Sequence, residues 1–198
     1  MRYGIVLAAA LTMQGLQAQP TVRQLYDAGK FREVIAAADQ AHADPELPRL
    51  EYLAGQSHEK LGEADLARQT YERLAAGDNP AWASIAKSAI ALLDKQFDPA
   101  LAAADEAVAS GPDIPETHYQ LGLVRMNRRE YEPAAAAFDA ALALDPAFAQ
   151  AHYYGGLAEY RAKRIDKMAA HFEAFLKLAP DAPERKEVES IMRTVRGG

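Results

Sequence analysis

The sequence contains no cysteine among its 198 residues, and this excludes several kinds of chemistry. Without thiols the chain cannot form a disulfide, bind a metal through cysteine or use a cysteine nucleophile. Basic residues are also sparse, because 22 Lys and Arg stand against 28 Asp and Glu. The densest basic cluster, Arg125 to Arg129, is followed at once by Glu130 and Glu132. A nucleic-acid binder needs a basic stripe, so we expect no nucleic-acid partner.

Long apolar runs are missing as well. The run Gly4 to Met13 is shorter than the roughly 20 residues that span a bilayer, and no second apolar stretch approaches that length. We therefore expect no stable membrane span once a leader is removed. Arg2 precedes this run and a small polar segment ending near Ala18 follows it, a pattern typical of secretory signal peptides. We predict that residues 1–18 are a cleaved leader and that the protein is periplasmic or secreted, in a bacterial cell envelope. The alternative is a cytoplasmic protein whose first helix resembles a leader.

Motifs of common enzymes are also lacking. The sequence has no Gly-rich phosphate loop, no G-x-S-x-G elbow and no H-E-x-x-H. Adjacent carboxylates such as Asp105 and Glu106 would diverge on a helix and could not act together. We therefore predict no catalytic residue, no cofactor and no enzymatic activity; an enzyme with an unrecognised hydrolytic site is the alternative.

The histidines give no sign of a metal site. His118 and His152 recur at equivalent positions of a repeat described below, where helix packing would hold them about 10 Å apart. That separation is too large for one metal ion. The other three, His42, His58 and His171, have no convergent partner in the sequence. We predict that no metal is bound.

The clearest positive signal is an internal repeat. The segment from Pro115 aligns without a gap to the segment from Ala149, pairing His118 with His152 and Phe138 with Phe172 at a spacing of 34 residues. A third segment from Ala81 keeps the same frame. We predict an array over residues 19–182, made of a partial repeat 20–47 and four repeats, 48–80, 81–114, 115–148 and 149–182.

These segments resemble the tetratricopeptide repeat family. The fullest match to its pattern lies in one repeat and consists of Leu121, Gly122, Ala134, Phe138, Ala141 and Pro146. The resemblance implies an all-α fold, a right-handed superhelical solenoid of antiparallel helix hairpins. Such a solenoid needs a polar cap, and we predict that residues 183–198 are a capping helix and tail, with one apolar stripe at Val188, Ile191, Met192 and Val195.

Small residues explain how a hairpin closes. Gly122 and Ala134 leave almost no side chain, so the two helices of their repeat can approach closely, and Phe138 fills the remaining space. The repeat from Ala81 departs from the pattern, since Lys87 and Ser88 replace a Leu-Gly pair. We expect that hairpin to pack less regularly.

The resemblance also implies a binding surface. In the family, the first helices of the repeats line a concave groove, and the matching positions here are strongly aromatic and aliphatic. They are Tyr52, Gln56, Trp82, Ile85, Leu92, Tyr119, Leu123, Met126, Tyr153, Leu157 and Tyr160.

We expect this groove to bind a peptide or an amphipathic helix of a partner protein. The clamp positions that hold a C-terminal carboxylate in one subset of the family carry no Lys or Asn here. Two alternatives stay open: a cytosolic adaptor or secretion chaperone, and a groove covered by the C-terminal helix or by the mate in a homo-oligomer.

Overall fold

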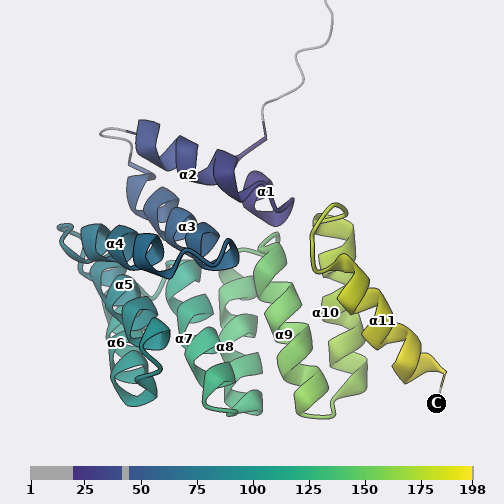
Figure 1. Cartoon of the computed structure of the whole chain (residues 1–198). Coiled ribbons are helices and arrows are strands. Elements are labelled where there is room, and N and C mark those ends of the chain that lie inside the picture. The colour runs from purple at the N-terminus through teal and green to yellow at the C-terminus, as the bar shows by residue number, and fades with distance from the viewer. Residues whose placement is uncertain (1–19, 42–44, 198) are drawn as a thin grey trace, which may run out of the picture.

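The computed structural model describes residues 20–41 and 45–197, and within these ranges it contains eleven helices and no strand. The predicted leader, residues 1–18, lies outside them. Figure 1 shows the helices stacked as consecutive hairpins in an all-α solenoid. In chain order they are α1 (Val22–Asp27), α2 (Phe31–Gln40), α3 (Leu47–Lys60), α4 (Ala64–Ala75), α5 (Pro80–Leu93), α6 (Phe97–Ser110), α7 (Pro115–Asn127), α8 (Tyr131–Leu144), α9 (Ala149–Arg161), α10 (Ile165–Leu178) and α11 (Arg185–Arg196). Among the described helices, none is both long and apolar enough to cross a membrane.

The helix boundaries follow the period seen in the sequence. The second helices α6, α8 and α10 begin at Phe97, Tyr131 and Ile165, each 34 residues after the previous one. Each tight turn before them contains a residue with positive φ, namely Lys95, Arg129 and Lys163. A left-handed residue at this point ends the first helix and reverses the chain within a few residues.

The close approach within each hairpin depends on a glycine. An ideal Cβ on Gly122 of α7 would lie 2.5 Å from Cε1 of Phe138, which is fully buried in α8. Gly156 of α9 faces Phe172 of α10 in the same way, with 2.5 Å to Cδ1. Any larger residue would collide with the ring, so the packing role expected for Gly122 is confirmed.

The expectation of irregular packing in the repeat from Ala81 is wrong. Helix α5 is continuous over 14 residues, and Asn79 caps its first turn by accepting hydrogen bonds from the backbone N–H groups of Ala81 and Trp82. Ser88 takes the place of glycine because its small side chain is fully buried and its hydroxyl donates to the Ala100 carbonyl at 2.9 Å. The hydroxyl therefore joins α5 to α6 where a larger side chain would separate them.

The C-terminal helix covers the last hairpin. Val188 and Met192 of α11 are buried against Phe172 and Phe175 of α10, and Ile191 and Val195 pack at the edge of the same cluster. This is the apolar stripe predicted from the sequence. The capping helix thus removes from water an apolar surface that a further repeat would otherwise cover.

Candidate binding groove

The structure buries six of the eleven predicted groove residues. These six, each at most 8% exposed, are Tyr52, Gln56, Trp82, Ile85, Tyr119 and Tyr153. The remaining five are half-buried and keep part of their surface in solvent; they are Leu92, Leu123, Met126, Leu157 and Tyr160. An open aromatic groove is therefore not what the fold presents, and only the second set can touch a partner without rearrangement.

The rings are buried because they pack on other rings, both within a hairpin and between successive hairpins. Tyr52 lies 6.3 Å from Tyr71 of its own hairpin and 6.1 Å from Trp82 of the next, measured between ring centroids. Tyr119 lies 4.7 Å from Phe148, the N-cap residue that directly precedes α9 of the following repeat. Burial raises the pKa of both the Tyr52 and the Tyr119 hydroxyl well above its usual value, so both stay protonated. These aromatics belong to the core that joins the repeats.

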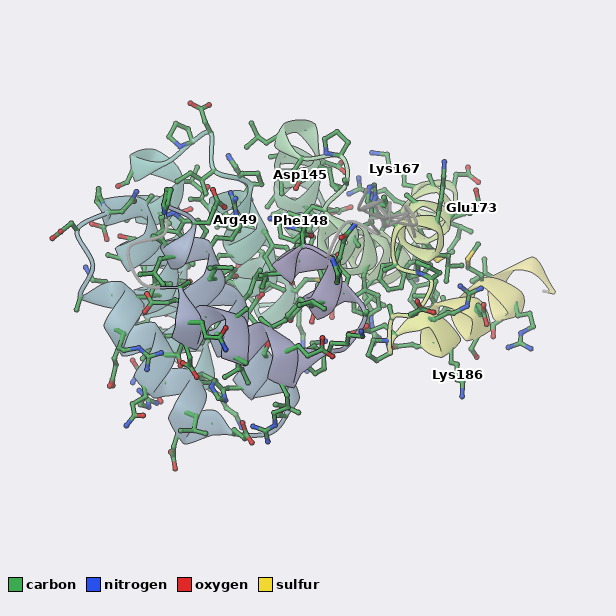
Figure 2. The ribbon with its side chains drawn as sticks, turned by 90° about the horizontal axis from the view of Figure 1, so that it is seen from above. Arg49, Asp145, Phe148, Lys167, Glu173 and Lys186 are labelled. Carbon is green, nitrogen blue, oxygen red and sulfur yellow. The ribbon has the colours of Figure 1, made fainter. Side chains whose placement is uncertain are left out.

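The N-terminal helix closes one end of the concave face. Arg23 of α1 pairs with the buried carboxylate of Glu116 and lies over the ring of Phe148, 4.0 Å from its centroid. Arg49 of α3 donates to the same Glu116 at 2.8 Å. Figure 2 shows Arg49, Phe148 and Asp145 close to the purple turn of α1. The groove is thus covered in part by α1, whereas the sequence suggested the C-terminal helix or a dimer mate.

A cavity nevertheless remains on the concave side. It has a volume of about 520 Å³ and lies between the first helices of four repeats, α3, α5, α7 and α9. We call it the concave pocket. Its lining residues are Gln56, Glu59, Ala89, Leu92, Leu93, Gln120, Leu123, Met126, Asn127 and Tyr154.

Four of the predicted residues, Gln56, Leu92, Leu123 and Met126, therefore meet in one place. Leu157, Tyr160 and Tyr153 do not reach the pocket, because they pack with the cluster under α11. Sequence reasoning missed Tyr154 and Asn127, which lie one position beyond Tyr153 and Met126 on the same helices. The sequence does not mark these two neighbouring positions as groove residues, because the rotation between successive repeats decides which side chains face the pocket.

A chain of hydrogen bonds fixes the floor of the concave pocket. The Gln56 amide donates to the Tyr52 hydroxyl at 3.1 Å, which donates to Oε1 of Gln120 at 2.7 Å. The Gln120 amide in turn donates to the Ser88 hydroxyl at 3.1 Å. The chain links α3, α7 and α5, so the pocket is rigid at its base while its apolar walls stay accessible.

The polar rim of the pocket carries a carboxyl group. Oε1 of Glu59 accepts a hydrogen bond from the Tyr71 hydroxyl at 2.5 Å. Burial raises the pKa of Glu59, while this hydrogen bond and the charge of Lys60 act in the other direction. Lys60 itself donates to Glu184 at 2.7 Å, so its charge is already paired. Among the residues that the structure describes, the rim therefore offers a partner an oxygen acceptor and no free cation.

The prediction that His58 and His171 lack a convergent partner is wrong. Nδ1 of His58 lies 2.8 Å from Oε2 of Glu63, while His171 meets two side chains. Its Nδ1 lies 3.3 Å from Nδ1 of His152, and its Nε2 lies 3.3 Å from Oδ1 of Asp139. The two histidines are on facing helices of one hairpin, and no sequence motif marks such a pair. His118, equivalent to His152, contacts only the Pro112 carbonyl among the contacts described, at 2.9 Å from its Nε2. His42 lies outside the described residues.

Residues 119–183, which cover most of the two C-terminal hairpins, match the tetratricopeptide repeat family. This part of the chain is therefore built of tetratricopeptide repeats. None of the curated proteins matches it closely enough to count as a relative.

Solved tetratricopeptide structures share the fold of this repeat protein. A thermophilic TPR protein of Thermus thermophilus superposes with a TM-score of 0.63 at 21% identity, over 85% of this chain and 94% of that one. The first TPR domain of Spaghetti, bound to an HSP90 peptide, gives 0.57 at 16% identity over 61% and 94%. The TPR domain of Arabidopsis OM64 gives 0.55 at 20% identity over 58% and 94%. At these identities the likeness establishes the fold alone.

Proposed function

We propose that this protein is a non-catalytic interaction module whose concave pocket takes an apolar segment of a partner protein. The observation that carries the proposal is the pocket itself, because Leu92, Leu123 and Met126 remain half-exposed there although the aromatic residues around them are buried. Half-buried aliphatic side chains above a rigid polar floor are typical of sites that bind apolar anchors. The Spaghetti domain, which shares the fold, is bound to an HSP90 peptide in its solved structure.

The polar groups of the pocket limit which partner segments can bind. Glu59 provides acceptor oxygens at the rim. Gln56 on the floor and Asn127 add amide groups, which already donate to the Tyr52 hydroxyl at 3.1 Å and to the Leu123 carbonyl at 2.9 Å. The positions equivalent to the carboxylate clamp carry Tyr52, Gln56 and Ile85 among others, with neither Lys nor Asn. We infer a partner segment with an aliphatic or aromatic anchor followed by a Lys, Arg or amide side chain, and not an acidic C-terminal tail.

The location forms part of the same proposal. The leader-like pattern of residues 1–18 supports a role outside the cytoplasm, where the module would recruit or scaffold partners in the cell envelope.

The test is a peptide selection against the full chain with matched variants. A displayed library of random peptides is enriched on the wild-type protein, and the enriched peptides are measured against Leu123→Glu and Met126→Glu. Each substitution places a carboxylate on the apolar wall, and we expect at least about tenfold weaker binding, as for loss of a central anchor. The matched control is Leu144→Glu, since Leu144 is exposed at the end of α8 and does not line the pocket.

The outcomes separate the alternatives. Retained helicity in all three variants, with binding lost only in the pocket pair, supports the proposal. Equal binding by all four proteins, or no enrichment at all, overturns it. Analytical ultracentrifugation of the protein alone tests a further occupant. If the protein forms a dimer and Leu123→Glu dissociates it, the pocket is occupied by a second copy of the chain.

A further inference from the structure

The contacts of two histidines define a polar cluster between α8, α9 and α10, apart from the concave pocket. Its members are Asp139 of α8, His152 and Glu159 of α9, and His171 of α10. One ligand atom each from Asp139, Glu159 and His171 lies within 4.8 Å of the other two. Figure 1 shows the three helices side by side. The cluster therefore brings three potential metal ligands from three helices to one place.

Hydrogen bonding determines which ring nitrogen of His171 is free. Nε2 of His152 lies 3.1 Å from the Pro146 carbonyl, which can only accept, so this nitrogen carries a hydrogen. Nδ1 of neutral His152 is then an acceptor, and Nδ1 of His171 donates to it across 3.3 Å. In the neutral form of His171, Nε2 is left with a lone pair.

That lone pair points at a negative group. Nε2 of His171 is 3.3 Å from Oδ1 of Asp139, and two acceptors facing each other at this distance repel unless a proton or a cation lies between them. For a tetrahedral ion with bonds of about 2.1 Å, ligand atoms lie about 3.4 Å apart. The separation between His171 and Asp139 suits a shared metal ion, and the ligand atom of Glu159 lies within 4.8 Å of both.

Glu159 supplies a second, independent observation. Its side chain is 1% exposed, and neither carboxylate oxygen has a hydrogen-bond partner. The nearest cations are Nε of Arg164 at 3.4 Å and Nζ of Lys167 at 3.9 Å, beyond good hydrogen-bond distance. A buried carboxylate without hydrogen bonds is costly, and coordination to a cation is one way in which proteins satisfy it.

We propose that Asp139, Glu159 and His171 bind a divalent transition-metal ion such as Zn²⁺, with water as the fourth ligand. Imidazole together with carboxylates selects zinc and its neighbours over Mg²⁺ or Ca²⁺, which prefer oxygen ligands alone. His152 does not contact the ion; it positions His171 through the Nδ1 contact, as outer hydrogen-bond partners of metal-bound histidines commonly do. The side chain of Asp139 is half-exposed and gives the ion a path from solvent.

Charge and architecture agree with this site. Two carboxylates balance a divalent ion. Lys167, which projects from α10 in Figure 2, and Arg164 are exposed enough to turn toward solvent when the ion enters. The ion would fasten the second helix of the repeat 115–148 to both helices of the repeat 149–182. The ion would therefore stabilise the packing of the last two repeats against each other.

The experiment uses the full chain, free of any affinity tag and stripped of metal with a chelator. Zn²⁺ is titrated calorimetrically, and thermal unfolding is followed with and without the ion. We expect one site per chain and, at a hundredfold excess over the dissociation constant, a melting temperature raised by about 5–10 °C. Mg²⁺ at the same concentration should change neither measurement.

Variants locate the site. His171→Gln and Glu159→Gln should abolish the bound equivalent, and His152→Asn should weaken binding about 10- to 100-fold. The matched controls are His118→Asn, which has the same repeat position and proline contact as His152, and His58→Gln, which removes a histidine paired with Glu63 at 2.8 Å. Neither control should alter binding.

Asp139→Asn tests the same site if the buried variants His171→Gln and Glu159→Gln fail to fold. The Asp139 side chain is half-exposed, so we expect the fold to tolerate the amide. Loss of the zinc site in this folded variant supports the proposal. No stoichiometric Zn²⁺ binding to the wild type, unchanged binding in Asp139→Asn, or loss in His58→Gln instead overturns it.

Discussion

Two adjacent glycines in α9 allow a sharp test of how the hairpins pack. Gly155 and Gly156 have the same helical neighbourhood, so alanine at either position gains about 1 kcal/mol of helix propensity. They differ in what a Cβ would meet. At Gly156 it would lie 2.5 Å from Cδ1 of the fully buried Phe172, whereas at Gly155 it would lie 3.2 Å from Cε1 of His171.

The magnitudes follow from this contrast. Gly156→Ala forces a buried ring and two helices apart, and we expect an overpacking cost at the upper end of about 1–3 kcal/mol. After the gain in propensity, the free energy of unfolding should fall by about 1–2 kcal/mol, which lowers the melting temperature by roughly 2–8 °C. Gly155→Ala should stay within about 1 kcal/mol of wild type, because the half-buried His171 ring can shift by a few tenths of an ångström.

The assay is urea and thermal unfolding followed by far-ultraviolet circular dichroism. A double-mutant cycle with Phe172→Leu isolates the clash, since removing the ring should make Gly156→Ala far less costly. The reasoning is refuted if Gly156→Ala is as stable as Gly155→Ala, or if Phe172→Leu leaves the cost of Gly156→Ala unchanged.

Two further predictions concern the N-terminal part of the chain. Burial raises the pKa of Asp27 in α1 from 3.8 to about 6, although the charge of Arg23 opposes the rise. The folded protein therefore binds a proton more tightly than the unfolded chain, and stability falls as pH rises from about 4 to about 6. Asp27→Asn should thus raise the free energy of unfolding by up to about 3 kcal/mol at pH 7.5 and by nothing at pH 3.5, as measured by denaturant titration; a difference independent of pH would contradict this. The leader prediction is checked by N-terminal sequencing of protein made in its own cell type, which should begin near Gln19, whereas an intact Met1 on the folded protein would argue for the cytoplasm.

The hairpin architecture could be predicted because it depends on local spacing. Gly122 and Phe138 lie 16 positions apart in one hairpin, and their contact recurs wherever the 34-residue period places the same pair of types. The apolar stripe through Val188 and Met192 likewise follows from the helical period alone. Ser88 was predicted to disturb its hairpin, but its small hydroxyl side chain fits where glycine is usual and donates a hydrogen bond to the backbone of the opposite helix.

The binding surface was predicted only in part. Tyr52 and Tyr119 occupy the positions expected of groove residues, yet both are buried between hairpins. Their exposure depends on the rotation between successive repeats and on the return of α1, whose Arg23 reaches Glu116 across 93 residues of sequence. No local pattern encodes either of these.

The sequence by itself determined the class of fold and the period, because both depend on which residue types recur and at what spacing. It also excluded thiol chemistry, because it contains no cysteine. Only the tertiary structure decided which side chains face the concave pocket and that His152, His171, Asp139 and Glu159 meet. The reason is physical: stacking sums many small rotations between rigid hairpins, so the neighbours of a side chain depend on the whole array rather than on its own repeat.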